Sequence, residues 1–77
     1  MTVKDKAIGK IYDKYRETEH IMAHFIRNNN KERAAQIYNE CICYCMGVID
    51  MTNCRIGDEI WTTYDSLTDE LGDMLRK

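Results

Sequence analysis

The sequence contains no proline, only four glycines and a single phenylalanine among its 77 residues. Proline and glycine are the residues that most often interrupt helices or form tight turns, so their scarcity favours long helices. No apolar run approaches the roughly 18 residues that a membrane span requires, and residues 1–10 hold no apolar segment of a secretory signal. We therefore expect a helical protein of the cytoplasm without a membrane partner.

Neither sign of charge dominates the chain, because 11 basic residues stand against 13 acidic ones and the net charge is -2. This balance lacks the positive surface by which general nucleic-acid binders contact phosphates, so we expect no nucleic-acid partner. With 44% apolar and 31% charged residues, the composition is that of a folded protein. We expect one domain, over residues 1–77. A domain this small buries only about 60% of its unfolded surface, so it gains stability from a partner or a second copy.

Three segments with helical periodicity fill the sequence. Apolar residues recur at steps of three and four over residues 8–25, 34–48 and 60–74. Asn28 to Asn30 and Asn53 are expected to end helices, because asparagine tolerates the left-handed conformation found there. We predict an all-α three-helix bundle with helices at about 3–28, 31–53 and 58–76, running up-down-up because the connections are short. A helical hairpin whose third helix packs on another subunit is the alternative.

The short connections also predict which residues face each other. Facing positions sum to about 60 between the first two helices and to about 111 between the last two. The second register brings Gly47 near Tyr64, where a glycine would allow close approach of the two helices. It also brings Asp50 near Trp61, whose indole N–H needs an acceptor when it is buried.

Two histidines and two cysteines have the spacing of possible zinc ligands. His20 and His24 lie four residues apart on the first helix, as do Cys41 and Cys45 on the second. The predicted register spreads the four over about three helical turns of about 5.4 Å, too far for one tetrahedral ion. We therefore expect no zinc, and the sequence predicts no other metal or cofactor.

The cysteines are also possible redox groups. Cys41, Cys43 and Cys45 are predicted to be reduced thiols among apolar neighbours, which raises a thiol pKa and makes the group inert. Cys54 stands beside Arg55 in a predicted turn, where a thiolate is favoured, and its role is left open.

The chain holds no glycine-rich phosphate loop, no Gly-x-Ser-x-Gly elbow and no His-Glu-x-x-His helix. Residues 69–75 resemble the Glu-x-x-Asp helix of MazG-type nucleotide pyrophosphohydrolases, which hold magnesium with four carboxylates on two helices. The second motif of that family, Glu-x-x-Glu, is missing, because Glu17 is followed three residues later by His20. We carry no residues over and predict that the protein is not an enzyme, with a metal-dependent nucleotide hydrolase as a third alternative.

Residues 41–49 are apolar on every side of the predicted second helix, which is more than two neighbouring helices cover. We therefore expect a surface for self-association or for another protein, made by Tyr38, Ile42, Tyr44, Met46 and Ile49. Five tyrosines beside one phenylalanine fit such an interface, a boundary between core and surface, or a ligand pocket.

Charged residues also follow helical spacing. Lys6, Lys10 and Lys14 step by four along the first helix. Asp65, Asp69 and Asp73 step by four along the third and form either a solvated face or an acidic face for a basic partner.

These features predict a small intracellular helical protein that acts by binding proteins, as a regulator or inhibitor of the kind that a phage or mobile element encodes. Its expected partners are a further copy of itself, in a homo-oligomer, and another protein. The alternative function is binding of a small ligand, such as a nucleotide, in a tyrosine-lined pocket between helices or subunits.

Overall fold

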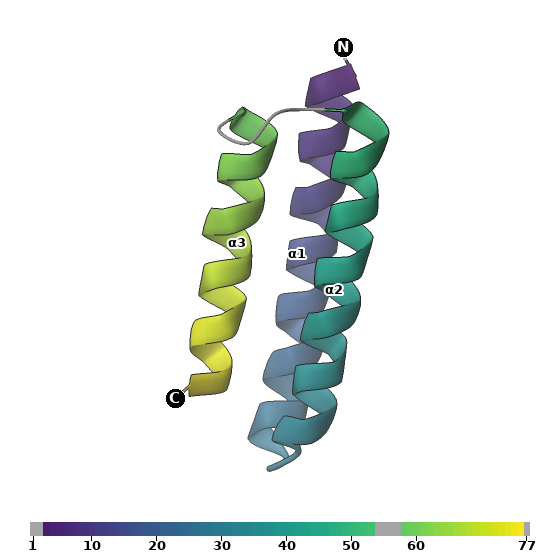
Figure 1. The fold of residues 1–77 in the computed structure, drawn as a ribbon. Coiled ribbons are helices and arrows are strands. Elements are labelled where there is room, and N and C mark those ends of the chain that lie inside the picture. The colour runs from purple at the N-terminus through teal and green to yellow at the C-terminus, as the bar shows by residue number, and fades with distance from the viewer. Residues whose placement is uncertain (1–2, 54–57, 77) are drawn as a thin grey trace.

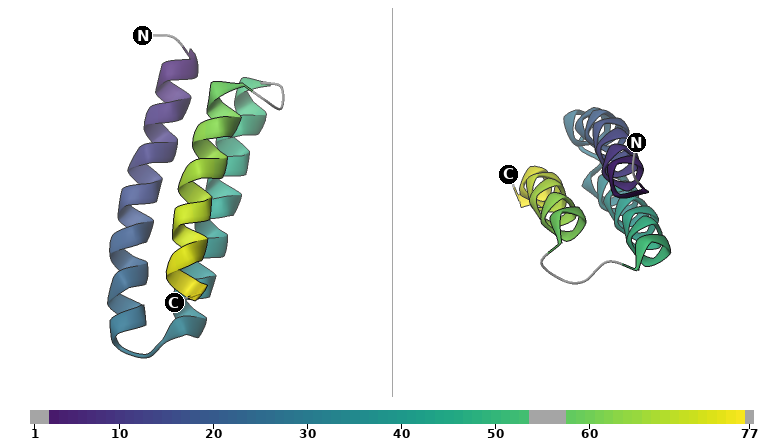
Figure 2. Two further views of the ribbon diagram at one scale, coloured as in Figure 1. Left: turned by 90° about the vertical axis from the view of Figure 1, so that its left-hand side faces the viewer. Right: turned by 90° about the horizontal axis from the view of Figure 1, so that it is seen from above.

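The computed structural model describes residues 3–53 and 58–76, which form three helices and, within those ranges, no strand. Helix α1 spans Val3–Arg27, α2 spans Lys31–Thr52 and α3 spans Glu59–Arg76. Successive helices run in opposite directions in a bundle, α1 and α3 downward and α2 upward in the view of Figure 1. Helix α3 packs against both α1 and α2 of its own chain (Figure 2). The predicted all-α bundle and its order are confirmed, and each described helix end lies within one residue of the predicted position.

Asparagines set the helix ends, as the sequence predicted. Asn29 and Asn53 both adopt left-handed backbone conformations, with φ of 60° and 56°, and the Asn53 N–H donates to the Asp50 carbonyl at 3.3 Å. Asn30 has a role that the sequence reading did not assign, because its side chain accepts a hydrogen bond from the Arg33 N–H at 3.2 Å and so caps α2.

The register between antiparallel helices follows from side-chain contacts. The Lys14 ammonium lies 5.4 Å from the centre of the Tyr44 ring, so facing positions of α1 and α2 sum to 58. A Cβ atom placed on Gly72 would lie 3.5 Å from the Tyr38 hydroxyl, so facing positions of α2 and α3 sum to 110. Both values agree with the predicted register to within two residues.

Helices α1 and α3 run parallel with a constant offset. The Lys4 ammonium lies 3.6 Å from a Glu59 carboxylate oxygen, and the Tyr15 hydroxyl lies 2.7 Å from a Glu70 carboxylate oxygen. Each pair is separated by 55 residues in the sequence. Polar contacts therefore hold this register at the start of α3 and again in its second half.

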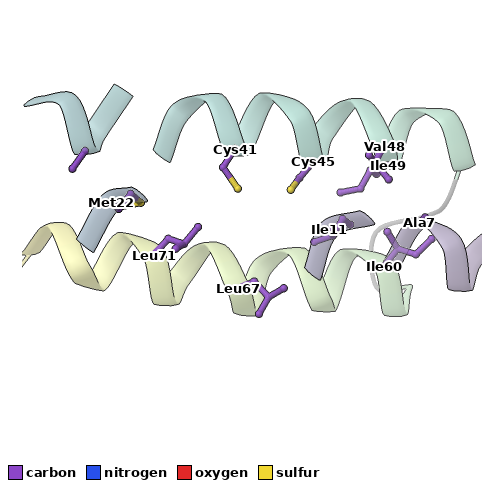
Figure 3. Packing of buried hydrophobic residues seen from close by; sticks show 11 residues of the cluster. Ala7, Ile11, Met22, Cys41, Cys45, Val48, Ile49, Ile60, Leu67 and Leu71 are labelled. Atoms are coloured by element: carbon purple, nitrogen blue, oxygen red, sulfur yellow. The ribbon is translucent and has the colours of Figure 1, made fainter. Parts of the chain in front are cut away.

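The core lies along the common axis of the helices (Figure 3). Its side chains come from all three helices, and the Cys41 and Cys45 side chains point inward from α2 toward α3. The buried apolar residues are Ala7, Ile11, Met22, Ala34, Cys41, Cys45, Val48, Ile49, Ile60, Leu67 and Leu71.

Two predicted contacts between α2 and α3 are wrong. Gly47 is exposed, and a Cβ atom placed on it would meet nothing within 4 Å. Cys45 and Ile49, two residues before and after Gly47, lie on the opposite side of the helix and are buried. Gly47 therefore points away from the core. Asp50 is exposed, and the buried indole N–H of Trp61 has no hydrogen-bond partner among the described residues. The axial register was right, but the rotation of α2 about its own axis was not.

The exposure of Gly47 leads to a stability prediction. Gly47→Ala should raise the free energy of unfolding by about 0.5–1 kcal/mol, because alanine loses less backbone entropy in a helix and has open space here. A urea melt followed by circular dichroism measures the change. A loss of stability would show that the glycine is packed against a neighbour, as the sequence reading had it.

Candidate functional site

An apolar groove lies between the beginning of α1 and the end of α2. We call it the α1–α2 groove and define it by its lining residues, which are Val3, Lys6, Ala7, Lys10, Val48, Met51 and Thr52. Its volume is about 140 Å³. Ala7 and Val48 are buried at its base, and the Thr52 hydroxyl is satisfied by donating to the Ile49 carbonyl at 2.7 Å. The base therefore offers apolar surface without an unpaired hydroxyl.

The two walls of the groove carry the most exposed large apolar side chains of the described residues. Met51 on α2 is 80% exposed and Val3 on α1 is 70% exposed. One helical turn beyond Val48, Tyr44 is 44% exposed. Exposed apolar side chains gathered on one face are typical of a binding surface, whereas single ones scattered over a protein are not.

Positive charge follows one rim of the groove. Lys6, Lys10 and Lys14 lie on successive turns of α1, and Lys6 and Lys10 line the groove itself. Lys14 lies 3.9 Å from a Glu17 carboxylate oxygen and over the Tyr44 ring. Lys6 and Lys10 form no ion pair with any residue in the described ranges. The groove thus combines an apolar base with two cations whose counter-charges are not supplied within those ranges.

The predicted interface residues on α2 separate into three groups. Ile49 is 2% exposed and belongs to the core, so the surface role expected for it is wrong. Tyr38, Ile42 and Met46 are half-buried, and Tyr38 packs against Gly72 of α3. Tyr44 lies on the other side of α2, beside Lys14 of α1. We call Tyr38, Ile42 and Met46 the α2–α3 edge.

The predicted acidic row lies on the surface of α3. Asp65, Asp69 and Asp73 are all exposed. Asp73 pairs with Arg76, and this pairing raises the pKa of the Arg76 guanidinium. Thr62 and Ser66 are also exposed on this side of α3, beside the aspartates, so this face is polar.

Tyr15 connects α1 to α3 through a carboxylate pair. Its hydroxyl lies 2.7 Å from a Glu19 oxygen and 2.7 Å from a Glu70 oxygen. The pKa of Tyr15 is raised well above its usual range. The largest cause is hydrogen bonding to Glu19, followed by hydrogen bonding to Glu70 and by burial. The phenol therefore stays protonated at neutral pH and acts as a hydrogen-bond donor between two helices.

The histidines and cysteines do not come together as a ligand set. His20 and His24 are exposed on α1, whereas Cys41 and Cys45 are each 1% exposed in the core. Within residues 3–53 and 58–76, no three histidine, cysteine or acidic side chains are grouped closely enough to hold a metal ion.

The thiols differ from the prediction in two respects. Cys43 is exposed, so it is not the buried thiol that we expected. Hydrogen bonds from Cys45 and Thr18 lower the pKa of Cys41, although burial opposes them, whereas the bond to Cys41 and burial raise the pKa of Cys45. The expected rise in pKa therefore holds for Cys45, whereas at Cys41 hydrogen bonding opposes the effect of burial. Cys54 lies outside the described residues.

A second hollow lies near the end of α3. It has a volume of about 240 Å³ and is lined by Ala23, Ile26, Arg27 and Met74. One cation and three apolar side chains form it, and neither it nor the α1–α2 groove is lined by a tyrosine. The tyrosines do not gather around either hollow as the ligand-pocket alternative would have them.

In the described parts of the chain, no helix combines the length and apolar character needed to cross a bilayer. Comparisons with protein-family models, with curated proteins and with solved structures gave no match to this chain. Function is therefore argued from the surface itself.

The α1–α2 groove was missed by the sequence analysis although its lysine row was visible there. Val3 and Met51 lie 48 residues apart, and each is a single apolar residue at the edge of its helix. Only the antiparallel register brings these two positions to the same end of the bundle. The combination of that register with the row from Lys6 to Lys14 is the signal that could have located the groove.

Proposed function

We propose that this protein is a small cytoplasmic interaction protein that regulates or inhibits another protein by binding it through the α1–α2 groove, without catalysis. The observation that carries the proposal is the apolar groove whose walls hold Val3 and Met51, 70% and 80% exposed. Leaving such side chains in water gains nothing for the folded chain, whereas a partner that covers them gains about 25 cal/mol per Å² of apolar surface. A tyrosine beside the groove adds an aromatic residue of the kind that is frequent among interface hot spots.

The size of the groove favours a protein partner over a small ligand. Pockets for drug-sized ligands begin at roughly 300 Å³, and the α1–α2 groove holds about 140 Å³. That volume suits one or two inserted side chains. A protein partner would fill it with such side chains and cover Met51 and Tyr44 at the same time.

Met51→Asp tests the proposal. The substitution places a charge on the most exposed wall of the groove, so capture of a binding protein should fall at least about tenfold while the stability changes by no more than about 0.5 kcal/mol. The measurement is quantitative capture from the source cells with immobilised protein, with a thermal melt of each variant. Tyr12→Asp is the matched control, because Tyr12 is also exposed on α1 but does not line the groove.

Equal capture of the same proteins by wild type, Met51→Asp and Tyr12→Asp would contradict the groove as a binding surface. If only Tyr12→Asp loses capture, the binding surface lies on the side of α1 that carries Tyr12, opposite the groove.

Self-association through the α2–α3 edge is a second candidate function. The observation that favours it is that Ile42 and Met46, one turn apart on α2, are only half-buried within the chain. A second copy would cover what remains of them. The two surfaces lie on different sides of α2, so one molecule has room for both contacts.

A further inference from the structure

We infer that the α1–α2 groove binds an acidic amphipathic helix, which inserts apolar side chains between Val3 and Met51 and places carboxylates on Lys6 and Lys10. This inference rests on the proposed function, since it names the chemistry of the partner at the same groove. Three features of the groove support the inference. They are the spacing of its cations, the spacing of its apolar residues and its incompatibility with a second copy.

The cations repeat at the pitch of a helix. Lys6, Lys10 and Lys14 are four residues apart on α1, so their attachment points follow each other at about 6 Å along the axis. Carboxylates four residues apart on a partner helix repeat at the same interval, so a helix lying along α1 meets the lysines in order. Lys14 already contacts Glu17 and Tyr44, whereas Lys6 and Lys10 form no ion pair within the described parts of the chain.

The α2 side of the groove accepts side chains on the same spacing. Val48 at the base and Met51 on the wall follow at four and three residues after Tyr44, which lies just beyond the groove, and this is the periodicity of one helix face. A partner with apolar residues at i, i+3 or i+4 and i+7 presents a matching row, as in other helix-in-groove complexes. Acidic residues beside that row then fall on the α1 rim, where the lysines lie.

A second copy of the chain does not fit the groove. A symmetric dimer through this face would bring the row from Lys6 to Lys14 close to the same row of its partner, and like charges oppose such a contact. The acidic row of α3 cannot fill the groove in a head-to-tail arrangement either. The exposed residues beside Asp65 and Asp69 on that face are Thr62 and Ser66, which offer no apolar side chain to insert.

Synthetic peptides of about 16 residues test the inference directly, because a helix of that length spans the groove. The acidic probe carries leucines at i, i+3, i+4 and i+7 with glutamates on one flank, and the basic probe replaces those glutamates with lysines. Binding to the full chain is measured by fluorescence anisotropy. We expect the acidic probe to bind at least about tenfold more tightly than the basic one, with the difference shrinking at high salt.

A charge reversal on the protein gives the sharper measurement. Lys6→Glu/Lys10→Glu should weaken the acidic probe and strengthen the basic one, each by about tenfold. The control is Arg16→Glu/Arg27→Glu, which changes the net charge equally at exposed positions of α1 outside the groove. With this control, the acidic probe should still bind more tightly than the basic one. Circular dichroism establishes that both double variants are folded.

Each other result overturns the inference. If both probes bind the wild type equally and neither binds Met51→Asp, the groove binds helices without regard to charge. That result would reject the acidic partner but leave the proposed function standing. Binding of dodecanoate with no binding of either peptide would assign the groove to a lipid-like anion instead. A change in self-association of the Lys6→Glu/Lys10→Glu variant would assign it to a second copy, and absence of any peptide binding would reject an amphipathic helix as the partner.

Discussion

Replacing Leu71 with alanine is expected to remove about 2–5 kcal/mol from the free energy of unfolding, the cost of emptying a fully buried leucine site. Leu71 is 0% exposed and points from α3 into the core (Figure 3). Helix α3 is the shortest of the three and is held to the hairpin mainly by the buried row of Ile60, Leu67 and Leu71.

The effect is large relative to the whole stability of the molecule. A core in a chain this short rarely supplies more than about 3–5 kcal/mol. The variant is therefore expected to lose most of its helical circular dichroism signal at 25 °C, and a urea melt of any remaining folded fraction gives the difference. Met51→Ala is the matched control, because Met51 is apolar and exposed and its truncation should cost no more than about 0.5 kcal/mol. Equal melts for the two variants would mean that α3 does not pack through Leu71.

The helix ends and the register were predictable from the sequence because local chemistry determines them. Asn29 and Asn53 end helices through a backbone conformation that few other residues tolerate, whereas the capping of α2 by Asn30 was not predicted. Short connections then leave little choice of register. The contact between Lys14 and Tyr44 consequently falls within two residues of the predicted position.

The rotation of α2 about its own axis was not predictable in the same way. Over residues 41–49 every side of the helix is apolar, so periodicity alone does not decide which residues face the core. Cys43 and Gly47 are exposed whereas Cys41, Cys45 and Ile49 are buried, so neither residue type nor hydrophobicity distinguishes the inner cysteines from the outer one. Which of these residues face the core is decided by the packing of α2 against α1 and α3 together.

Surfaces were less predictable than the core because they are assembled from different helices. The acidic row of α3 belongs to one helix, and its exposure followed from its spacing. The α1–α2 groove joins Val3 and Met51, which only the packed hairpin brings together. The spacing of its lysines could be seen in the sequence. Without the wall that α2 forms, however, that spacing is the same as that of an ordinary solvated face.

Met46→Asp is expected to convert a wild-type dimer into a monomer, which is the second large effect. Ile42 and Met46 lie one turn apart on the α2–α3 edge, and each keeps part of its side chain in water. Completing their burial adds up to about 1–2 kcal/mol for each side chain, counted twice in a symmetric dimer. An aspartate at the centre of such a contact meets its own copy, so the loss of apolar contact and the repulsion act together.

Light scattering at high micromolar concentration measures this result. The wild type should have about twice the 9.1 kDa mass of one chain, and Met46→Asp should have the mass of one chain or, where the dimer is required for folding, lose its helical signal. Asp69→Ala and Met51→Asp are the matched controls, since neither lies on the α2–α3 edge, and both should leave the dimer intact. A single-chain mass for the wild type would end the self-association proposal.

The controls also separate the two surfaces of the molecule. If Met46→Asp alone abolishes the dimer and Met51→Asp alone abolishes capture of another protein, the α2–α3 edge and the α1–α2 groove act independently. If Met51→Asp also dissociates the dimer, the groove is part of the contact between copies. Acidic residues of the second copy must then neutralise the row of lysines beside it. Because Lys6 and Lys10 have no ion pair within the described residues, such a dimer would weaken when either lysine is replaced by glutamate. A dimer held by Ile42 and Met46 would not, since neither lysine lies on the α2–α3 edge.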